Sequence, residues 1–135
     1  MPVQRSETLP IRSDEDVVKV RQTVRTLAVE AGFSLVDQTK IVTAASELGR
    51  NTRLYGGGGT VEVEVLEEGT RRGVRLTFRD QGPGIPDVDL AMKDGYTTGH
   101  GLGLGLGGAQ RLSNEFKILS SPGTGTEVMI ARWKQ

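Results

Sequence analysis

The glycines of this chain are concentrated in one segment, and this concentration limits what the chain can fold into. Residues 80–108 hold nine of the 19 glycines and two of the five prolines. Glycine is 19 of 135 residues, about twice its usual share of ~7%. A stretch of this length is too long to serve only as a connection inside a compact domain. We therefore expect a functional role for it, and expect the flanking segments to build the fold.

Two helices are predicted before the glycine-rich segment. Ser13 is the expected N-cap of the first helix, which ends at Gly32, and acidic residues fill its first turn. Ser34 opens the second, with Asp37 three residues on as a capping-box analogue, and the four glycines at 56–59 end it. Residues at helical spacing predict the buried stripes: Val17, Val20, Val24, Leu27, Ala28 and Ala31, then Ile41, Ala44, Ala45, Leu48 and Thr52.

Strands are predicted on both sides of these helices and after the glycine-rich segment. Residues 4–11 contain Pro10 and suit an edge strand. Residues 60–66 and 74–78 alternate with period two and predict a hairpin, whereas 116–121 and 127–133 predict a final strand pair after a short helix near 106–114. In the first hairpin we expect Val61, Val63, Val65, Val74, Leu76 and Phe78 to face the helices, and Glu62, Glu64, Arg75 and Arg79 to face water as cross-strand charge partners.

This order of elements predicts the fold class. Most strands follow one another as hairpins, so the sheet is expected to be mixed and mostly antiparallel, with the helices on one face. The result is an α+β two-layer sandwich in a single domain spanning residues 1–135.

Charge and composition exclude several classes of function. Lys plus Arg and Asp plus Glu are both 17, and no basic run occurs, so no nucleic-acid partner is expected. There is no cysteine and a single histidine, His100, which excludes a disulfide framework and a multi-histidine metal site. No stretch of about 18 apolar residues exists, so we expect no membrane partner and a cytoplasmic location.

Three polar features are candidates for chemistry. Glu47 and Asn51 lie at i and i+4 on the second predicted helix, at the margin of its buried stripe; they form either a solvated polar edge or part of a site. Asp80 ends a strand and is followed by Gly82 and Gly84, which is typical of a simple turn but also of a carboxylate that points into a cleft.

The run Gly99–Gly108 precedes a helix and frees backbone N–H groups to surround an anion. Alternate leucines argue against a flexible spacer. The spacing Gly103-x-Gly105-x-x-Gly108 formally matches a dinucleotide-binding motif, but no strand immediately precedes it, and the chain also lacks the Gly-Lys-Ser/Thr of a P-loop. His100 is expected either on the surface or in contact with phosphate.

Taken together, these segments resemble the GHKL nucleotide-binding family, which groups gyrase-type ATPases, Hsp90, histidine-kinase catalytic domains and MutL-type proteins. Four motifs occur in the family's order: SELGRN at 46–51, DQGPGI at 80–85, GLGLGL at 101–106 and GTGT at 123–126. The resemblance implies the Bergerat ATP-binding fold. Residues 94–106, 47–51 and 54–56 are most similar to the RsbT-type serine/threonine kinases of stress-signalling complexes.

The resemblance also implies roles for individual residues. Glu47 would be the general base, and Asn51 would ligate Mg²⁺ through its amide oxygen. Asp80 would accept a hydrogen bond from the adenine amino group of ATP. Gly82 and Gly84 would let adenine approach the backbone, and Thr126 would support the hydrogen bonds around it. Amides at Gly101, Gly103, Leu104 and Gly105 would hold the phosphates.

Residues 86–100 would form a lid. Lys93, the one lysine in this lid, is the candidate to neutralise the phosphates, although it does not match a lysine of the family's motifs.

The resemblance implies a protein kinase that phosphorylates Ser or Thr on a small STAS-domain antagonist and then switches to another partner. Two other hypotheses stay open from the sequence. The chain could be a non-catalytic ATP-binding module that sequesters a sigma factor or activates a phosphatase, or it could mainly hydrolyse ATP slowly.

Overall fold

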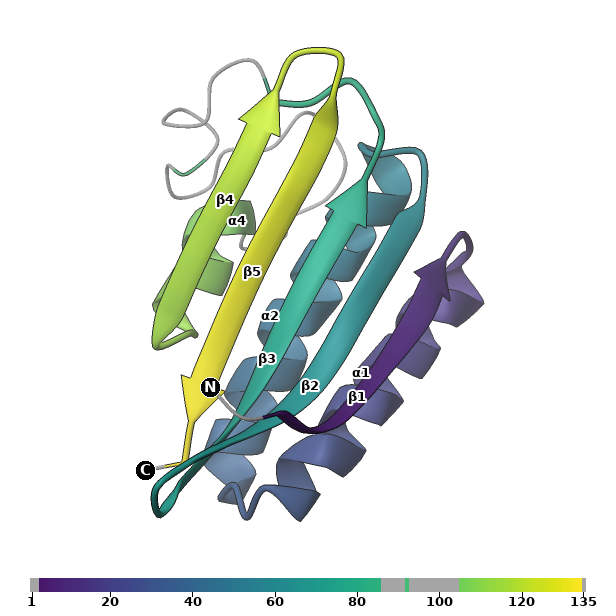
Figure 1. Cartoon of the computed structure of the whole chain (residues 1–135). Coiled ribbons are helices and arrows are strands. Elements are labelled where there is room, and N and C mark those ends of the chain that lie inside the picture. Colours follow the sequence, from purple (N-terminus) through teal and green to yellow (C-terminus); the bar gives the residue numbers. More distant parts are fainter. Residues whose placement is uncertain (1–2, 86–91, 93–104, 135) are drawn as a thin grey trace.

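The computed structural model describes residues 3–85, 92 and 105–134, which form two layers, a five-stranded sheet and a layer of helices on one of its faces (Figure 1). This confirms the predicted fold class and order of elements. The elements are β1 (Val3–Ile11), α1 (Asp14–Glu30), α2 (Leu35–Leu54), β2 (Gly59–Glu68), β3 (Arg71–Asp80), α4 (Gly105–Arg111), β4 (Glu115–Ser121) and β5 (Gly125–Trp133).

The sheet has the order β1-β2-β3-β5-β4, and all four pairings are antiparallel. β1 is an edge strand, as Pro10 predicts, because proline cannot donate to a second neighbour. The expected apolar residues of β2 and β3 are all buried against the helices. Because β3 pairs antiparallel with β5, and β4 and β5 form a hairpin, the end of β3 and the turn between β4 and β5 lie at the same end of the sheet (Figure 1).

Both long helices begin and end where the sequence predicts. The hydroxyl of Ser13 accepts from the backbone N–H of Asp16, and that of Ser34 accepts from Asp37. Gly32 follows the end of α1 with φ of 82°, a conformation that favours glycine. α4 is shorter than expected: it ends at Arg111, and the side chain of Asn114 instead accepts a hydrogen bond from the N–H of Trp133 at 2.7 Å.

One expectation about the outer face of the sheet is wrong. Glu64 does not face water but is buried. Arg75 lies directly opposite it on β3 and binds both carboxylate oxygens, at 2.8 and 3.0 Å. The planar guanidinium and its aliphatic stem cover the carboxylate, which is why a charged residue is tolerated there.

A second buried ion pair ties the two layers together. Arg132 of β5 contacts Asp37 of α2 with Nη2 at 2.7 Å and Nε at 3.2 Å, and its Nη1 donates to the carbonyl of Leu112, just after α4. The hydrogen bond from Arg132 holds the pKa of the Asp37 carboxyl below its ordinary value. The pair therefore fixes the start of α2 and the end of α4 against the same strand. None of the helices in the described part of the chain combines the length and the apolar composition of a membrane-spanning segment.

Candidate functional site

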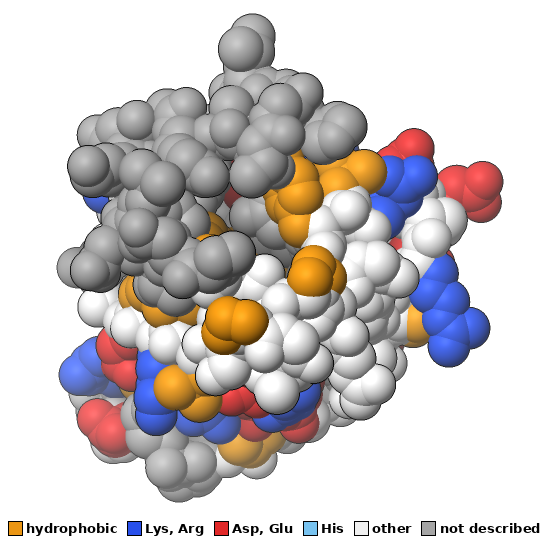
Figure 2. Space-filling view, turned by 90° about the horizontal axis from the view of Figure 1, so that it is seen from above, with side chains coloured by type: hydrophobic (Ala, Val, Ile, Leu, Met, Phe, Trp, Pro, Cys, Tyr) orange, Lys and Arg blue, Asp and Glu red, His pale blue; other side chains and the backbone are white. Residues whose placement is uncertain are grey.

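The candidate residues gather at one end of the sheet, the end at which β3 finishes. Two glycine-containing loops, 56–58 after α2 and 81–85 after β3, meet there with the turn between β4 and β5. Figure 2 looks down on this end of the sheet. Apart from the grey part, the centre of the view consists largely of backbone and uncharged side chains, and the charged groups lie mainly towards the rim. Such exposed backbone leaves amide groups available to a ligand.

Asp80, the last residue of β3, is held at this end of the sheet by two backbone amides. Its Oδ1 accepts from the N–H of Gly82 at 2.9 Å and from the N–H of Thr126 at 3.2 Å. Among the described residues, none donates a hydrogen bond to Oδ2. The carboxylate is therefore fixed by one oxygen and offers the other as an acceptor.

Gly56 lets the end of α2 approach Asp80. A methyl group added to Gly56 would overlap the Asp80 carboxylate, and one added to Gly82 would lie 2.7 Å from the Cα and the O of Gly56. The N–H of Gly56 in turn donates to the carbonyl of Asn51 at 3.2 Å. The helix end that carries Asn51 is thus brought directly against the carboxylate of Asp80.

The loop that contains Gly82 and Gly84 is fastened to the β4–β5 hairpin. The N–H of Gly123 donates to the carbonyl of Pro83 at 2.7 Å, and the N–H of Ile85 donates to the hydroxyl of Ser120 at 2.8 Å. Gly84 has φ of 79°, and a side chain there would overlap the carbonyl of Ser121. The second glycine of the predicted motif is needed for this close approach of two backbones.

Thr126 lies opposite both Asp80 and Ser120 in the register of the sheet. Its hydroxyl is 2.9 Å from that of Ser120, and Gly125 beside it has φ of 95° with no room for a Cβ next to the Asp80 carbonyl. Sequence reasoning missed Ser120 and Gly56. Ser120 could have been found from the hairpin register, whereas the close approach of Gly56 to Asp80 is a tertiary contact that no local pattern signals.

Glu47 and Asn51 lie on α2, both half-buried as predicted, at the margin between core and solvent. The Oε1 of Glu47 is 3.3 Å from Nη1 of Arg50, with the Glu47 side chain 12% exposed and that of Arg50 48% exposed. Along α2 and the loop that follows it, towards the end of β3, the chain therefore places first Glu47, then Asn51, and then the contact of Gly56 with Asp80.

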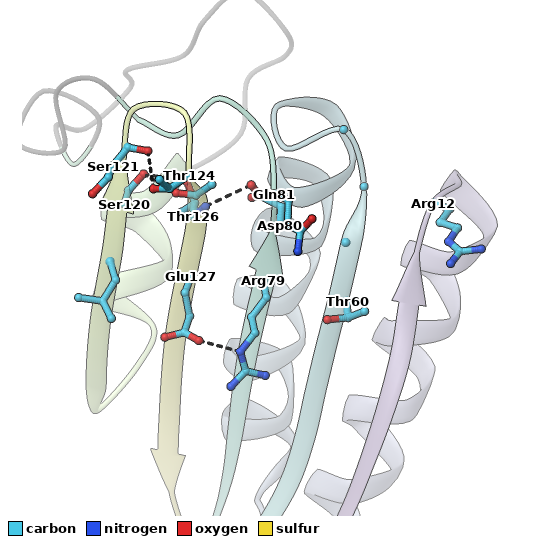
Figure 3. A pocket seen from close by; sticks show the side chains of 15 residues that line it. Arg12, Thr60, Arg79, Asp80, Gln81, Ser120, Ser121, Thr124, Thr126 and Glu127 are labelled. Atoms are coloured by element: carbon cyan, nitrogen blue, oxygen red, sulfur yellow. Dashed lines mark hydrogen bonds and ion pairs between the residues drawn. The ribbon is translucent and has the colours of Figure 1, made fainter.

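A hollow of about 940 Å³ opens at the same end of the sheet, on the face that carries no helix (Figure 3). It shares Asp80, Gly125 and Thr126 with the cluster above, but Glu47 and Asn51 do not line it. Arg79 and Glu127 point towards one another in its lower part and form an ion pair at 2.7 Å. Asp80 thus stands between this outer hollow and the helix layer.

Several predicted residues lie outside the described part of the chain: Gly101, Gly103, Leu104, Lys93, His100 and the lid 86–100, except for position 92. Gly105 is described; it begins α4, which packs against α2. The interior of α4 is made of small buried residues, Gly107, Gly108 and Ala109, which allow that contact to be close.

The chemistry of the donor set fits Mg-ATP. Among residues 3–85, 92 and 105–134, no three histidine, cysteine or acidic side chains gather into a metal cluster. Magnesium bound to nucleotide needs few protein ligands because phosphates and water complete its octahedron, and an amide oxygen such as that of Asn51 is a suitable hard ligand. The Oδ2 of Asp80, which accepts nothing from the described residues, suits a donor such as an exocyclic amino group.

The sequence is similar to a family of ATPases and to several bacterial regulatory proteins. Residues 36–135 match the family described as "Histidine kinase-, DNA gyrase B-, and HSP90-like ATPase". The chain is 45% identical over 123 residues to the serine/threonine-protein kinase RsbT of Bacillus subtilis, covering 91% of this chain and 92% of that protein. It is 32% identical over 117 residues to the anti-sigma F factor of Halalkalibacterium halodurans, covering 83% of this chain and 80% of that protein.

A solved structure shows the same arrangement of elements. The structure of the RsbU and RsbW domains of a Mycobacterium tuberculosis protein aligns with a TM-score of 0.65 at 23% identity. The alignment covers 98% of this chain but 32% of that longer chain, so the likeness concerns the fold of one part of it.

Proposed function

Because the chain belongs to the family of histidine kinase-, DNA gyrase B- and HSP90-like ATPases, we propose that it is an ATP-dependent serine/threonine protein kinase that regulates a partner-switching pathway. The family is the one expected from the four sequence motifs. The 45% identity to a serine/threonine-protein kinase over 91% of the chain supports the kinase activity.

The observation that carries the proposal is the way in which the carboxylate of Asp80 is hydrogen-bonded and oriented. Its Oδ1 is occupied by the amides of Gly82 and Thr126, while its position against Gly56 aims the carboxylate at the end of α2. A carboxylate held in this way accepts a hydrogen bond from the amino group of adenine and repels the carbonyl that guanine presents at the same place. We assign Asp80 to adenine recognition, with Thr126 supporting the carboxylate and with Gly82 and Gly84 letting the loop beside it pack against Gly56 and Ser121.

Glu47 and Asn51 are assigned to the chemistry. Bound Mg-ATP supplies the phosphoryl group, which passes to a Ser or Thr hydroxyl of the partner protein with ADP as the leaving group. Glu47 accepts the hydroxyl proton as general base, and Arg50, 3.3 Å from its Oε1, orients the carboxylate. Asn51 contributes an amide oxygen to Mg²⁺. The amides at Gly101, Gly103, Leu104 and Gly105 are assigned to the phosphates.

We propose a STAS-domain antagonist protein as the phosphate acceptor, followed by exchange for a second partner such as a phosphatase or a sigma factor. This follows from the kinship to a kinase and to anti-sigma factors in one set of relatives. The presence of Glu47 supports catalysis, because a protein that only binds nucleotide needs no general base.

A second candidate function is a nucleotide-binding module that sequesters a sigma factor, which the 32% identity to an anti-sigma F factor favours. Both functions share the nucleotide site, so ATP binding does not distinguish them. Transfer of phosphate to a partner does.

The test is transfer of label from γ-labelled ATP to purified STAS-domain proteins, with Glu47→Ala and Asn51→Ala as variants. We expect Glu47→Ala to lower transfer by about 10²–10⁴-fold while ATP still binds, and Asn51→Ala to weaken Mg-dependent ATP binding. Undiminished transfer in Glu47→Ala removes its assignment as base. Wild-type binding of ATP without transfer to any STAS-domain protein favours the binding module.

A further inference from the structure

We propose that one face of α2 is the surface on which the protein substrate docks, and that it selects a substrate with acidic residues beside the phosphorylated hydroxyl. The inference rests on the proposed kinase function and adds to it a binding surface and a partner chemistry. The surface, called here the α2 stripe, consists of Val36, Lys40, Thr43, Glu47, Arg50 and Leu54.

Helix geometry defines the stripe. At about 100° per residue, its six members fall within an arc of about 80°, and no other residue of α2 shares that arc. The buried residues Ile41, Ala45 and Leu48 lie on the other side of the helix. Val36 is 62% exposed and Leu54 is 41% exposed, and Lys40 and Arg50 are also exposed. The stripe is therefore exposed at its two ends, and Thr43 and Glu47 between them are half-buried.

The reaction requires a partner protein at the middle of this stripe. A general base must come within about 2.6–3.2 Å of the hydroxyl that it deprotonates. Thr43 and Arg50 lie about one turn, ~5.4 Å, on either side of Glu47, and Lys40 and Leu54 about two turns away. A standard interface covers about 800 Å² of each partner. A protein that delivers its hydroxyl to Glu47 therefore covers the rest of the stripe as well.

The charges on the stripe favour an acidic partner. Lys40 and Arg50 flank the single carboxylate of Glu47. Within the described part of the chain, Arg50 contacts Glu47 through Nη1 alone and its side chain is 48% exposed, so other donors of its guanidinium can bind a carboxylate of the partner. Exposed Val36 and Leu54 provide apolar contacts at the two ends of the stripe.

The same pattern disfavours a second copy of this chain as the occupant. Two α2 helices packed around a twofold axis at the centre of the stripe would bring Glu47 of each copy against Glu47 of the other. Like charges placed opposite each other are destabilising. A different protein, with acidic groups opposite Lys40 and Arg50, has no such conflict.

The test uses Lys40→Glu, with Lys19→Glu as the matched control. Both lysines are exposed, but Lys19 lies on α1 and outside the stripe. With the STAS-domain protein that accepts label from the wild-type chain, we expect Lys40→Glu at low salt to raise the KM for that protein about tenfold. The kcat and the KM for ATP are expected to stay unchanged, Lys40→Arg to restore the KM, and Lys19→Glu to match the wild type.

The apolar end has its own pair of variants. Val36→Asp places an acidic residue in the first turn of α2, where a helix tolerates it, and we expect it to raise the KM for the partner several-fold. Val18→Asp on α1, where Val18 is 45% exposed, is the control and is expected to leave the KM unchanged.

Equal KM values for Lys40→Glu and Lys19→Glu, with the wild type active, overturn the docking surface and leave the kinase proposal intact. A change in the oligomeric state of the chain caused by Lys40→Glu also overturns it, in favour of a second copy as occupant. If the wild type transfers no phosphate to any STAS-domain protein, the kinase proposal fails and the docking surface fails with it.

Discussion

Asp37 and Asp80 are two carboxylates at the ends of secondary-structure elements, and the molecule uses them in opposite ways. Asp37, in the first turn of α2, is buried and binds the guanidinium of Arg132 with Oδ1. Asp80, at the end of β3, is half-buried and is held by the uncharged amides of Gly82 and Thr126. The first is paired with a cation, whereas the second accepts only from backbone amides among the described residues, and its Oδ2 receives no hydrogen bond from them.

This difference shows what separates a structural carboxylate from a binding one. A buried ion pair is costly to break because removal of one partner leaves the other charge uncompensated. A carboxylate oriented by backbone amides is fixed in place without losing its capacity to accept a further hydrogen bond. Substitution of Asp37 should therefore change the free energy of unfolding, and substitution of Asp80 should change nucleotide affinity.

The largest expected effect is on stability. Asp37→Ala leaves Arg132 buried without its counter-ion, and we expect a loss of about 3 kcal/mol, with a Tm lower by about 10 °C. Fluorescence of Trp133, the single tryptophan, follows the unfolding. The control is Glu30→Ala, which breaks the exposed pair with Arg5 at 2.6 Å and should cost at most about 1 kcal/mol. Equal Tm shifts for the two variants contradict a structural role of Asp37.

The next effect is on binding. Asp80→Asn keeps an oxygen for the amides of Gly82 and Thr126 but replaces the available oxygen by an amino group. We expect ATP affinity, measured by titration calorimetry, to fall by about 10–100-fold, with Tm changed by no more than about 3 °C. A large fall in Tm with unchanged affinity would reverse the comparison and make Asp80 a second structural carboxylate.

A subtler perturbation moves the carboxylate without removing it. The added methyl group of Gly56→Ala overlaps Asp80, so we expect ATP to bind about tenfold more weakly. Gly49→Ala is the control, because a Cβ there makes an ordinary contact of 3.5 Å with Val17 and alanine favours the helix. If both variants bind ATP like the wild type, contact between Gly56 and Asp80 has no part in recognition.

The smallest effect is the pH dependence of stability. Because the hydrogen bond from Arg132 lowers the folded-state pKa of Asp37 below its ordinary 3.8, the unfolded chain binds more protons at acid pH. The contribution of Asp37 to the free energy of unfolding is complete when the pH is above the ordinary pKa. It is lost as the pH falls through the lowered, folded-state pKa. The free energy of unfolding, measured with urea at a series of pH values below about 5, should fall more steeply with decreasing pH for the wild type than for Asp37→Asn. Parallel curves contradict the link between Arg132 and Asp37.

Most of the scaffold follows from local sequence patterns. Ser13 and Ser34 cap helices, and Pro10 marks an edge strand, because each effect depends on neighbouring residues alone. The strand alternation of the first hairpin is equally local, and its valines are buried as expected.

Pairings between distant segments were not predictable in the same way. Asp37 and Arg132 are 95 residues apart, and nothing near Asp37 indicates more than a helix cap. Glu64 is buried although it occupies the outward position of its strand, because Arg75 covers it. The contact of Gly56 with Asp80 likewise appears only when the end of α2 meets the end of β3. The ordered motifs pointed to the candidate residues, whereas the contacts that orient Asp80 required the fold.

The kinase activity is tested by following one phosphoryl group through a single turnover. The chain, Mg-ATP and the STAS-domain protein are mixed in equal amounts, and the partner's intact mass and the free phosphate are measured together. We expect the partner to gain one phosphoryl group on Ser or Thr, little free phosphate to form, and Glu47→Ala to abolish the gain. Release of phosphate with an unmodified partner, or an unmodified partner with ATP intact, would contradict it.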